Sequence, residues 1–329
     1  MNLNRRQLAI SAAGLAVGET ATARFLAEEM LLRDRRPQRS RVAVISAEEY
    51  SEHLDEVLLS GLREFRLNLR GKSVLLKPNF VEYIAGVEVN TNPVVVGAAA
   101  EAFLKLGAKS VVVGEGPGHQ RDTYLVLAES GLAAQLSNQK ISFVDLNRDE
   151  LFKVPLRAAY TGLEHLWLPT TVLASDFVVS MPKIKTHHWA GVTLRMKNMF
   201  GILPGTKYGW PKNVLHWKGI HRSILDICAT VPMHFVIADG VIAMEGNGPL
   251  HGSHRHLGKI VLADDPVAAD FTCARLMGLN PNAVWHLDRA AHFLGNGSHD
   301  RIDLIAEGLP RKTVPFDVLP EFASLRTWV

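Results

Sequence analysis

Seven short apolar runs, rich in β-branched residues, alternate with helical patterns along the chain, and this alternation limits the possible folds more than any other feature. The runs lie at 42–46, 74–78, 110–114, 141–146, 177–181, 234–239 and 259–263. Continuous apolar runs of this length are typical of strands that are buried on both faces. Apolar residues recur at helical spacing in 51–65, 93–108 and 265–280. The pattern predicts an α/β fold with a mostly parallel sheet flanked by helices.

Two of the predicted helices carry a clear start signal. Asn92 is followed by Pro93, and Asp265 is followed by Pro266. Asn and Asp are good N-cap residues, and proline is favoured in the first turn of a helix. The chain has 329 residues, of which 47% are hydrophobic, so it is long enough for one large or two modest domains. We expect residues 41–329 to form the α/β domain, as one body or two lobes, with a C-terminal arm over about the last twenty residues.

The N-terminal segment has the layout of an export signal. Arg5 and Arg6 precede a short stretch rich in Ala and Gly, and residues 21–23 read A-T-A, an A-x-A cleavage site. This predicts a twin-arginine-type signal over residues 1–23, a basic linker over 24–40, and a periplasmic or extracytoplasmic protein. The alternative is an N-terminal amphipathic helix that continues past residue 23 in a cytoplasmic protein. The apolar stretch is too short to span a bilayer, and no other segment predicts a transmembrane helix.

Composition and cysteine content exclude several classes of function. The net charge of +3 and the 21% of charged residues fit neither a disordered chain nor a nucleic-acid-binding surface. Cys228 and Cys273 are the two cysteines, and they are far apart in the sequence. An iron–sulfur cluster or a cysteine-built zinc site needs about four closely spaced ligands. We expect the two cysteines to be buried small apolar side chains, with a disulfide as the alternative.

Polar residues or glycines follow five of the predicted strands. In an open α/β sheet, ligands bind beyond the carboxyl ends of the strands, so these groups should converge on one edge. They lie at 77–79, 114–119, 183–188, 239–248 and 264–265. Each group also has a purely structural explanation, because proline and asparagine end strands, Gly-Pro pairs make turns, and aspartate caps helices.

The segment 180–205 is the most informative of these groups. It contains Lys183, Lys185, Arg195 and Lys197 and no acidic residue. Like charges at a partly buried site repel unless a counter-charge is present. A bound anion would supply that charge, and the alternative is a set of carboxylates on neighbouring loops. The sequence therefore predicts a site for a small anionic ligand carrying phosphate or carboxylate.

We assign roles to individual residues on this basis. His187 and His188 are candidates for acid/base catalysis or metal ligation, with Lys183 as a further catalytic candidate. Because neighbouring residues on a strand point to opposite faces, we expect at most one of the two histidines to face the site. The substrate-binding candidates are Lys77, Asn79, Gly116, Lys185, Lys197 and Asn198. Asp239 and Glu245 would either bind a divalent cation or balance the lysines.

A series of motifs carries a family resemblance. The motifs are KPN at 77–79, TNP at 91–93, GEGPG at 114–118, PKIKTH at 182–187, GVTLRMKNMFG at 191–201, ADGVIAMEGNGP at 238–249 and DPVAAD at 265–270. Over roughly residues 40–280 the chain resembles the domain-of-unknown-function family 362, and it is distantly similar to the nickel-dependent lactate racemase group, which is also α/β. Many relatives carry a ferredoxin-like cysteine module, which this chain lacks.

Together the residues and the resemblance favour an exported enzyme that acts on a small anionic substrate. Isomerisation and cofactor-dependent redox chemistry are the two reaction types that we expect, and the cofactor is left open, with a divalent metal as one alternative. The competing hypothesis is a protein that binds an anion or cofactor without turning it over.

Overall fold

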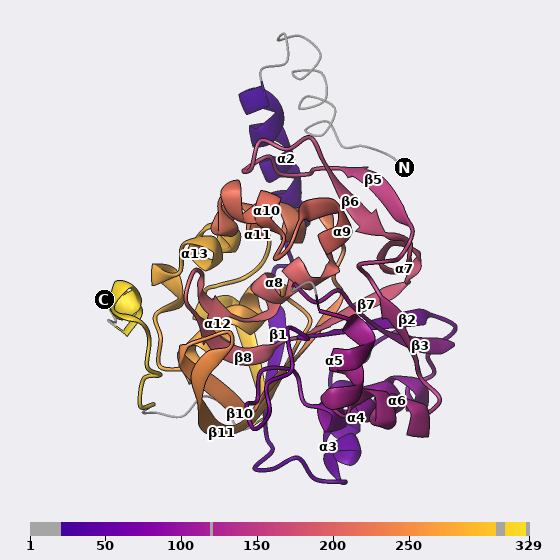
Figure 1. Cartoon of the computed structure of the whole chain (residues 1–329). Coiled ribbons are helices and arrows are strands. Elements are labelled where there is room, and N and C mark those ends of the chain that lie inside the picture. Colours follow the sequence, from indigo (N-terminus) through magenta and orange to yellow (C-terminus); the bar gives the residue numbers. More distant parts are fainter. Residues whose placement is uncertain (1–20, 119–120, 307–312, 327–329) are drawn as a thin grey trace.

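The computed structural model describes residues 21–118, 121–306 and 313–326, and a ten-stranded sheet forms its centre (Figure 1). The strand order is β12-β1-β11-β10-β7-β2-β3-β4, and β8 pairs with β10 and β9 beside this path. The strands of this sheet are β1 Ser40–Ser46, β2 Ser73–Pro78, β3 Ser110–Glu115, β4 Ser142–Asp145, β7 Phe177–Met181, β8 Lys183–His187, β9 Gly191–Thr193, β10 Phe235–Asn247, β11 His251–Ala263 and β12 Ile302–Ala306. Two further strands, β5 Leu151–Pro155 and β6 His165–Pro169, form a separate antiparallel pair.

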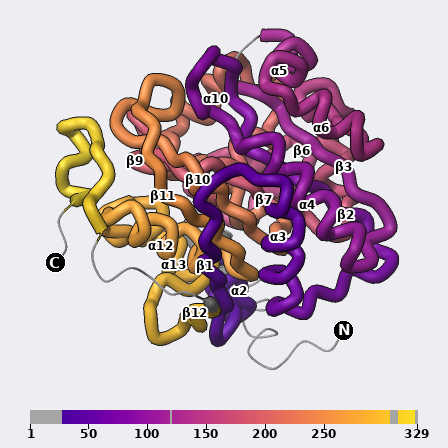
Figure 2. The backbone as a smooth tube through the Cα atoms, turned by 90° about the horizontal axis from the view of Figure 1, so that it is seen from below, coloured from indigo at the N-terminus to yellow at the C-terminus, as the bar shows by residue number. Residues whose placement is uncertain are grey.

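Most of the strand pairs are parallel, which confirms the predicted fold class. β12 lies beside β1 at one edge, and β2, β3 and β4 follow one another at the other (Figure 2). Among the described strands of this sheet, only β11 and β9 run antiparallel to their neighbours. All seven apolar runs of the sequence lie in strands of this sheet.

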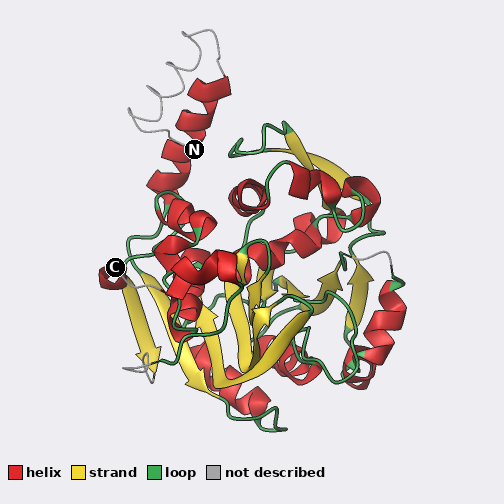
Figure 3. Ribbon diagram, turned by 60° about the vertical axis from the view of Figure 1, so that its left-hand side comes forward, coloured by secondary structure: helices red, strands yellow, loops and turns green. Residues whose placement is uncertain are grey.

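Helices cover both faces of the sheet (Figure 3). Alternate residues of a strand point to opposite faces, so Val74 and Leu76 pack in one apolar cluster while Leu75 packs in the other. The first cluster includes residues of α3 Leu54–Arg63, α4 Pro93–Lys105, α5 Thr123–Glu129 and α6 Leu132–Asn138. The second includes residues of α8 Arg195–Asn198, α11 Ile220–Thr230, α12 Pro266–Leu276 and α13 Trp285–Ala291. Three short helices complete the set: α7 Thr170–Ala174, α9 Gly205–Tyr208 and α10 Asn213–Trp217.

The two predicted helix starts have the expected geometry. The side chain of Asn92 accepts a hydrogen bond from the backbone N–H of Val94 at 3.0 Å. Asp265 Oδ1 accepts from the backbone N–H groups of Val267 and Ala268 at 2.7 and 3.1 Å. These bonds satisfy donors that the first turn of a helix leaves unpaired.

The segment that we interpreted as a basic linker is mostly helical. Helix α2 spans Ala21–Arg35 and leads into β1 at Ser40. Glu29 pairs with Arg289 at 3.0 Å, and Leu32 packs against the apolar cluster. Contacts with α13 and the core hold this helix, which agrees with the alternative of an N-terminal helix that continues past residue 23. The twin-arginine pair, Arg5 and Arg6, lies outside the described residues.

The polar groups that follow the five strands do not all converge, contrary to our expectation. β10 and β11 form a long antiparallel hairpin, so β11 ends beside the start of β10, at the opposite ends of the strands. Asp264 lies there, next to the start of β1, and accepts from the Arg41 N–H at 2.8 Å. Asp264 and Asp265 are therefore far from the edge where β2, β3 and β10 end.

Other expectations concern the cysteines, the C-terminus and the membrane. Cys228 and Cys273 are both free and buried, as predicted. In the C-terminal segment, Phe316 and Leu325 are buried against the core. No helix in the described ranges has both the length and the apolarity that crossing a bilayer requires.

Candidate functional site

A cavity of about 280 Å³ lies beyond the carboxyl ends of β2, β3 and β8. Its polar lining residues are Asn79, Glu115, Gly116, Lys185, His187, His188, Thr193, Lys197, Asn198, Lys212 and His216. It therefore brings together both candidate histidines and five of the six candidate substrate-binding residues. The structure places Lys77, Lys183, Asp239 and Glu245 outside the cavity wall.

Three lysines reach this cavity, and their contacts are with carbonyl oxygens and a ring. Lys212 Nζ donates to two carbonyl oxygens at 2.7 and 2.8 Å, and Lys185 Nζ donates to two others at 2.7 and 3.4 Å. Lys197 Nζ lies 4.4 Å from the centre of the Phe200 ring. Burial, and then the charge of Lys77, lowers the pKa of Lys197 to about 8. Burial likewise lowers the pKa of Lys212 to about 7 and that of Lys185 well below its ordinary value.

Lys77 has a structural role instead of the predicted ligand-binding one. Its ammonium group forms a fully buried ion pair with Glu115 and also donates to Asn198 Oδ1 at 2.8 Å and to the Pro78 carbonyl at 2.7 Å. These three acceptors use all three of its protons. Burial lowers the pKa of Lys77, and the charge of Glu115 opposes this shift. Asn198 is held by the same contacts, so it positions the cavity wall.

Three buried polar atoms in the cavity wall have no hydrogen-bond partner: Asn79 Oδ1, Glu115 Oε2 and Thr193 Oγ1. Buried polar groups are nearly always paired, so an unpaired group needs an explanation. Two of these atoms are pure acceptors and the third is a hydroxyl. A ligand that carries donors of its own would satisfy them.

Gly116 is a candidate for substrate binding, but its backbone groups already form hydrogen bonds within the protein. Its backbone N–H donates to the Gly201 carbonyl at 3.0 Å, and its own carbonyl accepts from Lys212. The N–H group is thus not available to hold an anion. Gly116 lines the cavity and orients Lys212.

His187 is neutral, and its tautomer is fixed by the backbone. Its Nδ1 accepts from the N–H groups of Trp189 and Ala190 at 3.0 and 3.2 Å, so the ring proton is on Nε2. Burial, followed by the charge of Lys197, lowers the pKa of His187 well below its ordinary value. His187 can therefore donate a hydrogen bond from Nε2 to a ligand and does not serve as a base.

His188 has the opposite tautomer. Its Nδ1 lies 2.8 Å from the Gly248 carbonyl, and because a carbonyl oxygen only accepts, Nδ1 carries the proton. The lone pair is then on Nε2. The two rings are stacked, with centroids 4.9 Å apart, and both line the cavity. The expectation that only one would face the site was wrong, because β8 ends at His187 and the strand alternation stops there.

The sequence interpretation missed Lys212 and His216. His216 lines the cavity from α10, with Nδ1 3.1 Å from the Lys212 carbonyl, and burial is the main cause that lowers its pKa to about 4. The signal was present, because the acid-free region continues beyond residue 205 to residue 225. Lys212 also has a left-handed backbone, with φ of 69°, which is uncommon for a residue other than glycine.

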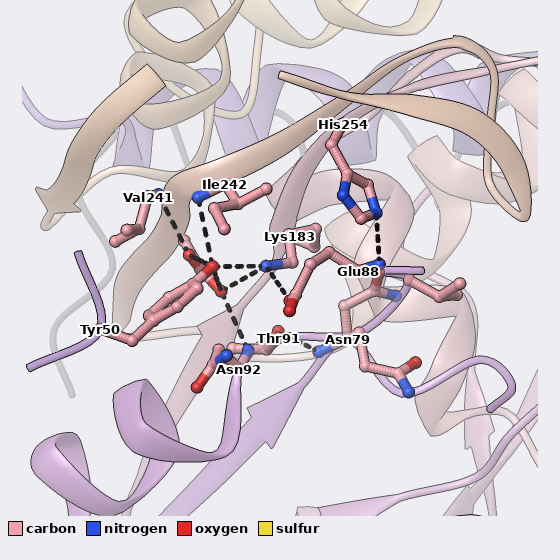
Figure 4. Close-up of polar contacts among 12 residues, drawn as sticks. Tyr50, Asn79, Glu88, Thr91, Asn92, Lys183, Val241, Ile242 and His254 are labelled. Carbon is pink, nitrogen blue, oxygen red and sulfur yellow. Dashed lines mark hydrogen bonds and ion pairs between the residues drawn. The ribbon is translucent and has the colours of Figure 1, made fainter. Parts of the chain in front are cut away.

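Lys183 lies in a second polar cluster, which is drawn in Figure 4. Its Nζ contacts Asp239 Oδ2 at 2.9 Å, the Tyr50 hydroxyl at 2.8 Å and Glu88 Oε2 at 3.4 Å. Asp239 also accepts from the Asn92 N–H at 3.0 Å. The counter-charge of Lys183 is therefore supplied by carboxylates on neighbouring loops, which is the alternative to a bound anion.

Asp239 and Glu245 do not form a common metal site. Asp239 contacts Lys183, whereas Glu245 accepts from the Asp317 N–H at 3.1 Å and lies 3.6 Å from Arg255. Within the ranges that the structure describes, no three or more His, Cys, Asp or Glu side chains are grouped to hold a metal ion.

The sequence of residues 74–275 matches the family described as a domain of unknown function, DUF362. The chain belongs to this family. A thylakoid-associated protein of Synechocystis sp. is 29% identical over 220 residues, which are 65% of this chain and 65% of that protein. The chain thus spans less than two thirds of the length of this relative. The predicted family resemblance is confirmed.

Two solved structures match the chain at low similarity. The lactate racemase apoprotein from Thermoanaerobacterium thermosaccharolyticum is 13% identical, with a TM-score of 0.40 over 68% of this chain and 55% of that one. A Thermotoga maritima protein is 12% identical, with a TM-score of 0.33 over 61% of this chain and 53% of that one.

Proposed function

We propose that the cavity binds a small anion that also carries a hydroxyl or amino group, and that the protein isomerises this ligand by moving a proton. The observation that carries the proposal is the composition of the cavity wall. Three lysines without a carboxylate contact, Lys185, Lys197 and Lys212, line the same cavity as Asn79 and Glu115, whose Oδ1 and Oε2 atoms are unpaired. The lysines favour a carboxylate or phosphate, and the acceptors favour a donor on the same molecule.

The histidines supply the groups that proton transfer needs. His188 Nε2 has a lone pair and would remove a proton from the carbon next to the anionic group, becoming an imidazolium. His187 Nε2–H would donate a hydrogen bond to the oxygen on which negative charge develops, and it would keep its own proton. Return of that proton from the His188 imidazolium, to the opposite face of the carbon once the planar intermediate has turned or to a neighbouring atom, completes an isomerisation and leaves His188 neutral again.

Solvent deuterium exchange tests the reaction without knowledge of the product. The full chain is incubated in D₂O with a panel of small hydroxy- and aminocarboxylates and phosphate monoesters, and loss of the α-proton signal is followed by NMR. We expect exchange with at least one compound. The variant His188→Gln should retain binding of that compound, measured as a rise in melting temperature, but exchange should slow by at least about 100-fold. His53→Gln, on an exposed histidine that does not line the cavity, serves as the control.

The alternative is a non-catalytic anion-binding protein, and the same experiment separates it from an enzyme. If a ligand raises the melting temperature but its protons never exchange, the isomerase proposal is wrong and the binding function remains. If no compound of the panel raises the melting temperature, and Lys197→Met does not change this result, both the isomerase hypothesis and the binding hypothesis are wrong.

Export remains part of the proposal. It rests on Arg5, Arg6 and the A-T-A site at 21–23. Cleavage after residue 23 would leave Arg24–Arg35 of α2, including the pair between Glu29 and Arg289. The intact mass of the protein from its own host should correspond to a chain that begins near residue 24, and a full-length cytoplasmic form would exclude export.

A further inference from the structure

Arg195 is a buried arginine, and two of its three guanidinium nitrogens, Nε and Nη1, have no hydrogen-bond partner. It is the first residue of α8 and is 2% exposed. Its backbone N–H donates to Asp270 at 2.7 Å, but its side-chain Nε and Nη1 have no hydrogen-bond partner. A buried charge destabilises a folded protein unless other groups compensate it. The proposed function does not use this residue.

A second cavity, of about 310 Å³, lies next to Arg195. It is bordered by the C-terminal end of α2, the segment before β10, and the end of β11. The second cavity and the first cavity lie at opposite ends of the strands, because β10 begins and β11 ends beside the second cavity. Lys197 and Asn198, only two and three residues further along α8, line the first cavity instead.

Four arginines line the second cavity: Arg35, Arg36, Arg157 and Arg195. Two carboxylates, Asp264 and Asp265, also line it, and both are engaged with other groups. Asp265 accepts from two backbone N–H groups of α12, from Ser40 Oγ and from the Asn296 N–H. Asp264 accepts from the Arg41 N–H.

Asp270 is the remaining acid near Arg195. Its two oxygens accept from the backbone N–H groups of Arg195 and Met196, at 2.7 and 2.9 Å. Burial raises the pKa of Asp270 to about 7, which reduces its negative charge near neutral pH. The carboxylates of this region therefore leave the guanidinium group of Arg195 without a direct partner.

The rest of the cavity wall is apolar. It includes Leu32, Met196, Val231, Met233 and Phe293. An inorganic ion would leave this apolar surface uncovered, whereas a ligand with a hydrocarbon part would cover it.

We propose that this cavity is a second binding site, for a carboxylate or phosphate monoester with a short apolar body. The anionic group lies among the four arginines, with Arg195 at the base and Arg157 at the exposed rim, and the apolar part lies along Val231, Met233 and Phe293. Guanidinium groups suit both anions, because they donate planar pairs of hydrogen bonds. The proposal does not depend on the function of the first cavity.

Calorimetric titration of the full chain tests the site with three probes: hexanoate, hexyl phosphate and inorganic phosphate. We expect hexanoate or hexyl phosphate to bind with a stoichiometry of one in Lys197→Met, in which the first cavity is weakened. Affinity in that background should fall at least about tenfold in Arg157→Gln and be lost in Arg195→Met. Arg63→Gln, on an exposed arginine of α3, is the matched control and should change nothing. Comparison of the two hexyl compounds identifies which anion the site prefers.

Stability and pH give independent readouts. Because Nε and Nη1 of Arg195 have no partner in the ligand-free protein, Arg195→Met should melt at the same temperature or higher. Arginine side chains stay charged from about pH 6 to 9, so any loss of hexanoate affinity as pH rises through this range should come from ionisation of Asp270 beside Arg195. Unchanged binding in both arginine variants would overturn the proposal, as would the absence of binding by all three probes in Lys197→Met. Equal affinity for inorganic phosphate would show that the apolar part of the site is wrong.

Discussion

Replacing Glu115 by glutamine isolates the ion pair on which the wall of the first cavity depends. Lys77 and Glu115 are both at most 2% exposed, and the variant leaves the ammonium group of Lys77 with only neutral acceptors. Breaking a buried pair in this way costs about 3–5 kcal/mol. For about 300 ordered residues the entropy of unfolding is about 0.6 kcal/mol/K, so the melting temperature should fall by about 5–8 °C.

Differential scanning calorimetry at several pH values checks this reasoning. Without Glu115, the pKa of Lys77 in the folded protein lies further below its value of about 10.4 in the unfolded chain. The deficit should be largest near neutral pH and shrink as pH rises toward about 10, because the unfolded chain then loses its advantage in binding the proton. Adding Lys77→Met to the variant should recover at least half of the lost stability.

An exposed pair provides the control for this experiment. Lys105 and Glu101 lie 2.7 Å apart on α4, and each side chain is 43% exposed. Glu101→Gln should lower the melting temperature by less than about 2 °C, because solvent screens the charges of an exposed pair. If Glu115→Gln has an effect as small as this control, the buried pair does not stabilise the cavity wall as we describe.

Three further predictions concern other parts of the two polar clusters. By calorimetric titration, anion affinity in the first cavity should fall at least about tenfold between pH 8 and 9, and a flat profile would contradict this. The reason is that Lys197 and Lys212, whose pKa values are about 8 and about 7, must take up protons to bind the anion. Gly201→Ala should destabilise the fold by at least about 3 kcal/mol in urea unfolding, because a Cβ there would lie 1.9 Å from a carboxylate oxygen of the buried pair, and wild-type stability would refute the close approach. Asp239→Asn should lower stability by about 3 kcal/mol in the same assay and leave anion binding unchanged, because Lys183 lies outside the cavity, and loss of binding would show that the clusters are coupled.

The sequence by itself determined the class of fold and which side chains follow the carboxyl ends of the strands. Continuous apolar runs such as 74–78 and 177–181 need burial on both faces, which only a sheet covered by helices provides. The starts of α4 and α12 were also predictable, because capping is a local interaction between a side chain and N–H groups two or three residues away. The acid-free segment 180–205 indicated an anion site for a similarly local reason, since its charges have no partner within reach along the chain.

Tertiary structure decided which cations are paired. Lys77, Lys183 and Lys185 all follow or lie on strands, and the sequence treats them alike. In the structure Lys77 meets Glu115, and Lys183 meets Asp239, whereas Lys185 meets only carbonyl oxygens. The sequence separation of these partners is 38 residues or more, so no local pattern could distinguish the three lysines.

Tertiary structure also decided at which ends of the strands each group of polar residues lies. The direction of β11 follows from its hairpin with β10, and it moves Asp264 and Asp265 away from the first cavity. The same packing places α8 between two cavities, so Arg195 and Lys197 border different cavities although they are two residues apart. Apolar periodicity specifies which residues are buried, but it carries no information on strand direction or on the partners that burial brings together, because both depend on contacts between distant segments.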